Sequence, residues 1–200
     1  MSKNLLTISG SYRPNGITEQ AISILAQEAT ERGWNSQHIR LIEKNIKYCT
    51  NCRSCTQSPG TARGRCIIQD DDVPAILQAV DQSDALVLAA PTNYFDVTAV
   101  TRTFLERLIP AGLWPWGQGA PRWRDKSPLR RSVLITSTAM PALFGRFFTT
   151  SLKALGNMST CLRAKPVDRV FLGMIALQPD QRLSPSATRR LTGAAARLLA

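Results

Sequence analysis

The chain has 200 residues, enough for one domain with a substantial hydrophobic core, and its composition is that of an ordinary water-soluble protein. No apolar run approaches the length of a membrane span, and the polar residues 1–4 are unlike a signal peptide, so we expect a cytoplasmic protein without a membrane partner. The formal net charge of +11 attracts anions of any kind. Because the basic residues lack the interleaved aromatic side chains of a nucleic-acid module, we expect no nucleic-acid partner.

Hydrophobic periodicity in the first half of the chain predicts alternating strands and helices. Apolar positions between residues 17 and 29 recur at helical spacing, and Gly33 supplies a C-terminal stop. The predicted elements, in chain order, are a strand at 4–9, a helix at 17–29, a weaker strand at 36–42, and a short helix at 73–80 that Asp71 or Asp72 caps. An irregular, cysteine-rich insert at about 47–70 precedes the short helix.

The second half continues the alternation. Residues 85–90 are apolar throughout, which is typical of a parallel strand covered on both faces. The later predicted elements are a helix at 97–108, a strand at 132–138, a helix at 143–155 with Gly156 beyond it, a strand at 170–177, and a helix at 185–199 with Ser184 as cap and Pro185 in its first turn. Five strands, each followed by a helix, with no linker or repeat, predict a single doubly wound α/β domain over residues 1–200.

The loop after the first strand, residues 10–18, carries the strongest functional signal. A helix start offers unpaired N–H groups and a partial positive charge, and Ser11, Arg13 and Thr18 add hydroxyls and a guanidinium, so the loop predicts a phosphate site. The sequence has neither the Gly-x-Gly-x-x-Gly of a dinucleotide site nor the Gly-Lys-Ser/Thr of a Walker loop. A hydroxyl-rich loop suits a terminal monophosphate, such as that of FMN. The alternative is an ordinary strand-to-helix turn with a threonine cap.

Two further loops are expected beside this one. In doubly wound sheets, ligands bind at the carboxyl ends of the strands, near the switch in strand order. The loops at 10–18, 91–96 and 137–142 each directly follow a predicted strand. We therefore expect the three loops to converge on one site.

Four of the five cysteines follow the pattern Cys49-x2-Cys52-x2-Cys55-x10-Cys66. The first three match the tight spacing of bacterial [4Fe–4S] ligation, whereas zinc usually takes two separated pairs and disulfides are disfavoured in a reducing cytoplasm. The last spacing is longer than in the compact iron–sulfur pattern. Free thiols packed in a loop above the flavin are therefore the alternative, and both interpretations stay open.

A second unusual segment is the connection at about 110–131, which is longer than most and holds Trp114, Trp116 and Trp123. We expect it to act as a lid, as a wall of the substrate pocket or as part of a dimer contact. The alternative is a surface loop that its indoles pin to the domain. Cys161 is expected to be a small packing residue, and His38, the only histidine, to be structural.

Three motifs carry a resemblance to a known family. Gly10-Ser11-x-Arg13 with Thr18, then Pro91-Thr92-x-Tyr94-Phe95 followed by Val97-Thr98, then Phe104-Leu105-x-Arg107, resemble the NADPH-dependent FMN reductase family of flavodoxin-like proteins. The cysteines resemble those of its iron–sulfur flavoprotein branch, and the likeness runs from the first strand to at least Ser137. It implies a flavodoxin-like, doubly wound, five-stranded parallel sheet with helices on both faces, non-covalently bound FMN, and a homodimer or homotetramer.

The resemblance also implies the residues of the cofactor site. The phosphate would be held by Ser11, Arg13, Gly16, Ile17 and Thr18, the isoalloxazine ring would be bordered by Pro91, Thr92, Asn93, Tyr94 and Phe95, and its other side would be closed by Ser137, Thr138 and Ala139. Asn93 departs from the usual family pattern, so a backbone contact carries over at this position but a side-chain role does not. In the iron–sulfur branch, Cys49, Cys52, Cys55 and Cys66 would hold a [4Fe–4S] cluster.

These features predict an FMN-dependent NAD(P)H oxidoreductase. Hydride would pass from NAD(P)H to FMN and on to a small acceptor, such as a quinone, a free flavin, an azo compound or a nitro compound. Because the flavin carries the chemistry, no catalytic side chain is expected. One alternative is an iron–sulfur flavoprotein that exchanges electrons with an acidic, ferredoxin-like partner, and another is a flavin-binding regulatory protein without turnover.

Overall fold

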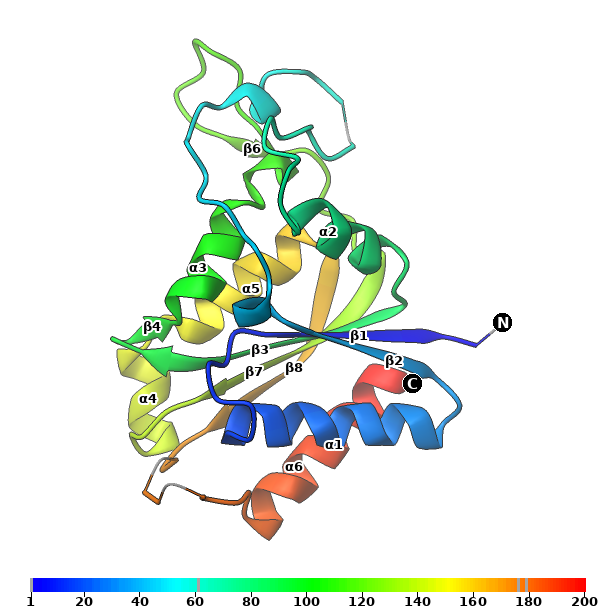
Figure 1. Cartoon of the computed structure of the whole chain (residues 1–200), viewed down its shortest axis with the longest axis vertical. Helices are drawn as coiled ribbons and strands as arrows, with labels where there is room; N and C mark the ends of the chain where they lie inside the picture. Colours follow the sequence, from blue (N-terminus) through cyan, green and yellow to red (C-terminus); the bar gives the residue numbers. More distant parts are fainter. Residues whose placement is uncertain (1, 61, 176, 179) are drawn as a thin grey trace.

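The computed structural model describes residues 2–60, 62–175, 177–178 and 180–200. Five strands form a parallel sheet in the order β2-β1-β3-β7-β8 (Figure 1). They are β1 (Asn4–Ser9), β2 (Asn35–Arg40), β3 (Ala85–Asn93), β7 (Arg130–Ser137) and β8 (Ala164–Leu172). The short strand β4 (Asp96–Val97) pairs antiparallel with the end of β3, and β5 (Gly112–Leu113) pairs with β6 (Arg122–Trp123) in a separate ribbon.

Helices cover both faces of the sheet. On one face lie α1 (Ile17–Glu31) and α6 (Pro185–Leu199), and on the other lie α2 (Val73–Asp81), α3 (Ala99–Glu106) and α5 (Ser151–Cys161) (Figure 1). Alternate residues of the strands supply the two core layers: Leu6 and Leu86 pack toward α2, α3 and α5, whereas Leu5 and Val87 pack toward α1 and α6. The predicted flavodoxin-like fold is therefore confirmed.

Short helices connect these layers. The helix α4 (Ala142–Phe148) follows β7, and single 3-10 turns lie at Leu41–Glu43, Ser54–Thr56 and Ile109–Ala111. Ser184 caps α6 as predicted, because its hydroxyl accepts the backbone N–H of Ala187 at 3.2 Å. No helix in the described ranges has both the length and the apolar composition that crossing a membrane requires.

The last strand of the sheet begins earlier in the chain than the apolar pattern predicts. The predicted strand spans 170–177, but β8 occupies Ala164–Leu172 and pairs with β7 on both sides of an irregularity at Val167. As an edge strand, β8 is only partly buried in its first half, where it carries Lys165, Asp168 and Arg169. These charged residues break the apolar run on which the prediction depended.

The helix predicted at 143–155 is also wrong, because the structure divides it into α4 and α5. Thr149 is extended, and the backbone N–H of Thr150 donates to the carbonyl of Phe95 at 2.8 Å, so the break is fixed by a contact from a distant segment. Gly156, expected beyond the helix, lies inside α5. The strand at 85–90 is longer than predicted and continues to Asn93.

Candidate functional site

The three predicted loops meet at the carboxyl ends of β1, β3 and β7, which are neighbours in the sheet. The backbone N–H of Gly10 donates to the carbonyl of Ala89 at 2.8 Å, which ties the first loop to β3. The hydroxyls of Thr18 and Ser137 lie 2.9 Å apart, which ties the start of α1 to the end of β7. Residues from all three segments are thus brought together.

The residue that precedes α3 holds the first loop in place. The Thr98 hydroxyl donates to the carbonyl of Gly10 at 2.7 Å. A Cβ atom at position 10 would lie 1.7 Å from Oγ1 of Thr101, so this close approach requires glycine. Sequence reasoning placed the Gly10 motif correctly but gave no sign that α3 supports it.

Within the loop, Ser11 shapes the backbone. Its buried hydroxyl accepts the N–H of Arg13 at 3.2 Å and donates to the carbonyl of Arg13 at 3.1 Å. Because its proton is used inside the loop, Ser11 supports a ligand through loop geometry. The Gly16 N–H donates to the same carbonyl at 3.2 Å, and the side chain of Arg13 lies at the surface.

The first turn of α1 fits a phosphate group. Gly16 precedes the helix in an extended conformation, and no side chain caps the helix start. The N–H groups of Ile17 and Thr18 belong to the first turn, which has no intrahelical acceptors and carries the positive end of the helix dipole. The Thr18–Ser137 hydroxyl pair holds two protons and uses one in its mutual bond, so the second can be donated to an anion.

The second segment forms a tight hairpin. Thr92 pairs with Val97 and Asn93 with Asp96, which leaves Tyr94 and Phe95 as the turn. Both have positive φ, 47° and 64°, a conformation that two-residue hairpins usually assign to Asn-Gly and that costs other residues about 1 kcal/mol or more each. Such strain is often found at ligand sites.

The aromatic rings of this hairpin are presented to solvent. Tyr94 is fully exposed and Phe95 is 58% exposed. At the base of the hairpin, the partly buried Pro91 lies opposite Ser137 of β7, and the Thr92 hydroxyl lies 2.9 Å from that of Ser151. The hairpin therefore stands at the carboxyl end of β3, next in the sheet to the end of β1 from which the first loop begins.

The third segment closes the group of loops. The Thr138 N–H donates to the carbonyl of Leu172 at 2.9 Å, and its carbonyl accepts the N–H of Ile175 at 3.1 Å, whereas Ala139 is exposed. Beyond it, α4 exposes four large apolar side chains that sequence reasoning did not single out: Leu143, Phe144, Phe147 and Phe148. Their spacing in the run Leu-Phe-x-x-Phe-Phe was the available signal.

The four clustered cysteines line one small cavity of about 10 Å³. Burial and the neighbouring thiols of Cys66, Cys49 and Cys52 raise the pKa of Cys55 to about 11. Cys52 is exposed, and hydrogen bonds from Ser54 lower its pKa. All five cysteines are free thiols.

The cysteine cavity has the residue types that an iron–sulfur cluster needs as ligands, but its volume is too small for a cluster. Among the described residues, no three His, Cys, Asp or Glu side chains are placed to hold a metal ion. A [4Fe–4S] cluster distributes its four thiolate ligands over four separate irons, and four cysteines line this cavity. The cavity that they line measures about 10 Å³, which is smaller than a [4Fe–4S] cluster.

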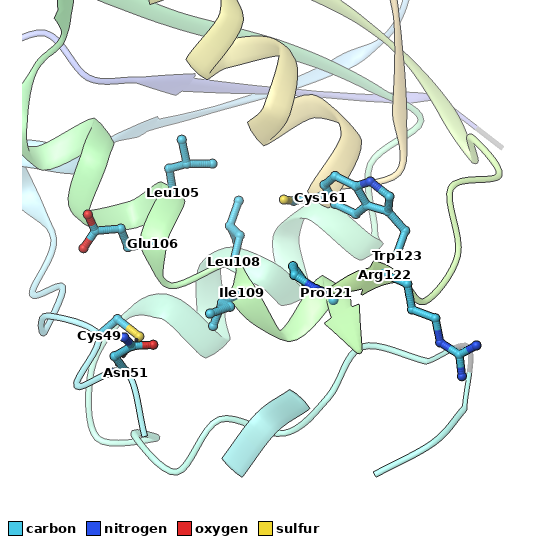
Figure 2. A pocket seen from close by; sticks show the side chains of 11 residues that line it. Cys49, Asn51, Leu105, Glu106, Leu108, Ile109, Pro121, Arg122, Trp123 and Cys161 are labelled. Atoms are coloured by element: carbon cyan, nitrogen blue, oxygen red, sulfur yellow. Dashed lines mark hydrogen bonds between the residues drawn. The ribbon is translucent and has the colours of Figure 1, made fainter. Parts of the chain in front are cut away.

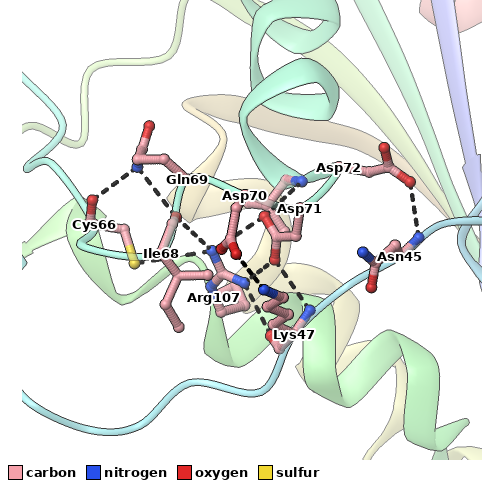
Figure 3. A network of polar contacts seen from close by, with 10 residues as sticks. Asn45, Lys47, Cys66, Ile68, Gln69, Asp70, Asp71, Asp72 and Arg107 are labelled. Atoms are coloured by element: carbon pink, nitrogen blue, oxygen red, sulfur yellow. Dashed lines mark hydrogen bonds and ion pairs between the residues drawn. The ribbon is translucent and has the colours of Figure 1, made fainter.

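Arg107, the last residue of the third motif, holds the cysteine-rich insert in place. Its side chain is fully buried and forms an ion pair with the equally buried Asp71 (Figure 3). It also donates to the carbonyls of Lys47 at 2.9 Å and Ile68 at 3.1 Å, and it lies 3.8 Å from Sγ of Cys66. Arg107 thus ties both ends of the cysteine-rich insert to the end of α3.

The tryptophan-rich loop packs on the cysteine-rich insert. The guanidinium of Arg53 lies 3.6 Å from the ring centre of Trp114 and 4.0 Å from that of Trp116. Arg124 donates to the carbonyl of Cys55 at 3.1 Å. Two of the indoles therefore fix the loop against the insert.

Beside this contact lies an apolar cavity of about 650 Å³ (Figure 2). It is lined by Leu105 from α3, Leu108 just after that helix, Trp123 from β6, and the side chains of Cys49 and Cys161. Burial raises the pKa of the Cys161 thiol to about 11, which agrees with a packing role. The tryptophan-rich loop thus lines one side of this cavity, and its role as a lid, a wall of the substrate pocket or a dimer contact stays a prediction.

The strand order, the helices on both faces and the group of loops at the carboxyl edge define the class: a flavodoxin-like α/β protein. The chain matches the sequence profile of the NADPH-dependent FMN reductase family over residues 4–189, and it belongs to that family. This confirms the resemblance found in the motifs. The family's own description names NADPH and FMN, which agrees with the expected cofactor pair.

Solved structures agree on the fold. The chain is similar to an FMN-dependent NADH-azoreductase from Bacillus anthracis in complex with FMN, with a TM-score of 0.71, 14% identity, and coverage of 98% of this chain and 99% of that one. An NAD(P)H:quinone oxidoreductase from Methanothermobacter marburgensis gives a TM-score of 0.67, 15% identity, and coverage of 98% and 97%. At these identities the likeness establishes the fold alone.

Curated relatives are iron–sulfur flavoproteins. One from Archaeoglobus fulgidus is 34% identical over 112 residues, which cover 56% of this chain and 48% of the relative. Another from Methanocaldococcus jannaschii is 29% identical over 106 residues, which cover 53% and 52%. The chain spans about half the length of the curated relatives it matches, and these matches agree with the branch that the cysteines indicated.

Proposed function

We propose that this protein is an FMN-dependent NAD(P)H oxidoreductase, built as a single FMN-binding domain, that reduces a small acceptor such as a quinone, flavin, azo or nitro compound. When bound, FMN supplies the hydride chemistry. The observation that carries the proposal is the uncapped start of α1 beside the Thr18–Ser137 hydroxyl pair, at the edge where three loops meet. Membership of the FMN reductase family supports the same assignment.

Different segments of the chain bind different parts of FMN in this proposal. The N–H groups of the first turn of α1 and the Thr18–Ser137 pair bind the phosphate dianion, and Arg13 adds a positive charge. Backbone groups of residues 91–95 border the ring, with the Tyr94 and Phe95 side chains as a wall on one side. Residues 137–139 close the other side. No proton transfer by a side chain is needed in this scheme.

The binding assignment is tested with apo-protein and FMN. Thr18→Ala should raise the dissociation constant for FMN about tenfold, because a hydrogen bond to a charged group contributes about 1.5–3 kcal/mol. Thr30→Ala is the matched control on the same helix, since its exposed hydroxyl only bonds the carbonyl of Ala26. Flavin fluorescence gives both constants. Equal affinity in the two variants would contradict the phosphate assignment.

Activity is tested with the FMN-loaded protein under anaerobic conditions. NADPH and NADH oxidation is measured with a soluble quinone, free flavin, an azo dye and a nitro compound in turn. The proposal expects turnover with at least one acceptor. A protein that binds FMN but turns over none of these acceptors contradicts the enzyme proposal and favours a regulatory flavoprotein.

A homodimer or homotetramer is the proposed assembly. The exposed apolar side chains of α4 support it, because monomeric proteins rarely leave such a group uncovered. Light scattering of Phe147→Glu should show a smaller particle than wild type, and an unchanged mass would remove α4 from the interface. Five free thiols support a reducing compartment, so the cytoplasm remains the proposed location.

A second candidate function is electron transfer by an iron–sulfur flavoprotein. The specific observation in its favour is that four thiols line one cavity. Here an acidic, ferredoxin-like partner would complement the net charge of +11. Iron and acid-labile sulfide are measured after anaerobic purification of wild type, Cys55→Ser and the control Cys161→Ser. Iron in wild type and in the control, but not in Cys55→Ser, supports the cluster, and iron-free wild type rules against it.

A further inference from the structure

A buried carboxylate lies beneath the first loop and has no part in the proposed binding. Glu19 is the third residue of α1 and only 7% exposed. One of its oxygens accepts the hydroxyl proton of Ser9, and the other lies 3.0 Å from Nε2 of His38. The Nε of Arg40 lies 3.7 Å from Oε1 of Glu19, the oxygen that accepts the Ser9 proton. Two residues of β2 and one of β1 therefore surround the Glu19 carboxylate.

Hydrogen bonds connect this carboxylate to the first loop. Because the Ser9 hydroxyl donates its proton to Glu19, its oxygen is free to accept, and it accepts the backbone N–H of Ser11 at 3.1 Å. The Ser11 hydroxyl in turn accepts the N–H of Arg13 and donates to its carbonyl. The path from Glu19 to the residues of the phosphate site is unbroken.

The charge of Glu19 is not what a phosphate site needs. A carboxylate in the first turn of α1 stabilises the helix but repels a phosphate dianion bound at the same turn. The guanidinium of Arg40 offsets that charge and also pairs with Glu43. The arrangement therefore keeps a hydrogen-bond acceptor at this place while compensating its electrostatic cost.

We propose that Glu19 is a positioning residue for the phosphate loop: it fixes the Ser9 hydroxyl, which holds the Ser11 amide in the conformation that binds the phosphate. Its acceptor oxygen, and not its negative charge, performs this role. The inference rests on the proposed FMN site and extends it to a residue that touches no ligand.

Glutamine can replace the acceptor without the charge. In Glu19→Gln, the amide oxygen accepts the Ser9 proton and the amide nitrogen donates to Nε2 of His38. The imidazole then carries its proton on Nδ1 and donates to Oγ1 of Thr7, 2.7 Å away, while the Thr7 hydroxyl donates to the carbonyl of Gln37 at 3.3 Å. The network closes with the other histidine tautomer, so glutamine preserves the geometry.

The test compares FMN with riboflavin, which lacks the phosphate, in titrations of apo-protein. Glu19→Ala should raise the FMN dissociation constant about tenfold and leave that of riboflavin unchanged, whereas Glu19→Gln should stay within about threefold of wild type for both. Glu31→Ala is the matched control, since Glu31 is exposed at the far end of α1 and accepts a hydrogen bond from the Gln27 side chain at 2.8 Å. Ser9→Ala breaks the same path at its next atom and should reproduce the alanine result if Glu19→Ala does not fold.

Each outcome has a clear meaning. If wild type binds FMN and Glu19→Ala binds it equally well, the positioning role is wrong. If Glu19→Gln loses as much affinity as Glu19→Ala, charge matters and the proposal is overturned, as it is when riboflavin affinity falls in parallel with that of FMN. If wild type binds no FMN, the proposed function itself fails, which is a distinct result.

Discussion

Replacing Arg107 by methionine removes a buried cation and leaves the Asp71 carboxylate without its charge partner. Both side chains are fully buried, so neither is solvated by bulk water. Burial opposes the charged form of Arg107, but Asp71 holds the pKa of Arg107 above its ordinary value. Breaking a buried pair from one side costs about 3–5 kcal/mol, because the remaining charge is uncompensated.

The structure places Arg107→Met near the lower end of that range. Asp71 keeps the backbone N–H groups of Lys47 at 3.0 Å and Val73 at 3.2 Å, which still satisfy part of its charge. The carbonyls of Lys47 and Ile68 lose a donor, however. We therefore expect a loss of about 3 kcal/mol, a large share of the 5–15 kcal/mol typical of a folded domain.

The assay is urea denaturation followed by tryptophan fluorescence, together with the double variant Arg107→Met/Asp71→Asn. Removing the orphaned charge should recover part of the loss. Arg102→Met is the matched control on α3, because Arg102 is 42% exposed and its pair with Asp96 contributes less than about 1 kcal/mol. A loss below about 1 kcal/mol for Arg107→Met, or a double variant less stable than the single one, would refute this reasoning.

Three other predictions follow from local geometry. Replacing Tyr94 by Asn and Phe95 by Gly should raise the free energy of unfolding by about 1–2 kcal/mol, because Asn and Gly adopt positive φ with less strain than the native aromatic residues. The same double variant should bind FMN more weakly. A lower melting temperature in calorimetry contradicts the strain argument. Gly10→Ala should cost about 1–3 kcal/mol through its clash with Thr101, and Thr101→Ala should relieve part of it in thermal melts. Hydrogen bonds from two arginines hold the pKa of Asp168 well below its usual range, so Asp168→Asn should lower stability at pH 7 by about 1–2 kcal/mol. Because that pKa is lowered in the folded state, the difference should be full above about pH 4 and shrink steadily as the pH falls below it, and a difference at pH 2 as large as that at pH 7 contradicts the reasoning.

The sequence could predict the parts of the fold that depend on apolar pattern. The strands β1, β3 and β7 are buried on both faces, and each reads as an apolar run, so their loops were placed correctly. The predicted start of β8 was wrong, because an edge strand tolerates the charges of Lys165 and Asp168 and so lacks a continuous apolar run. The break between α4 and α5 depends on a contact between Thr150 and Phe95, 55 residues apart, which no local pattern contains.

The sequence could predict the first-loop residues of the candidate site, but not the buried residues that hold the loops in place. The hydroxyls and glycines of the first loop are visible in sequence because the residue types themselves suit phosphate. Glu19 is a charged residue in an amphipathic helix and Arg107 directly follows one, and a solvent-facing position is the usual expectation for both. Both are buried only because distant segments supply partners, Asp71 for the first and His38 with Arg40 for the second.

The central claim is that a flavin phosphate binds where the first loop enters α1. Isothermal titration of the apo-protein with FMN, and separately with riboflavin, measures this directly. We predict one FMN bound per chain, with riboflavin bound at least about tenfold more weakly because it lacks the dianion. Equal affinity for the two flavins, or no heat with either, would contradict the account.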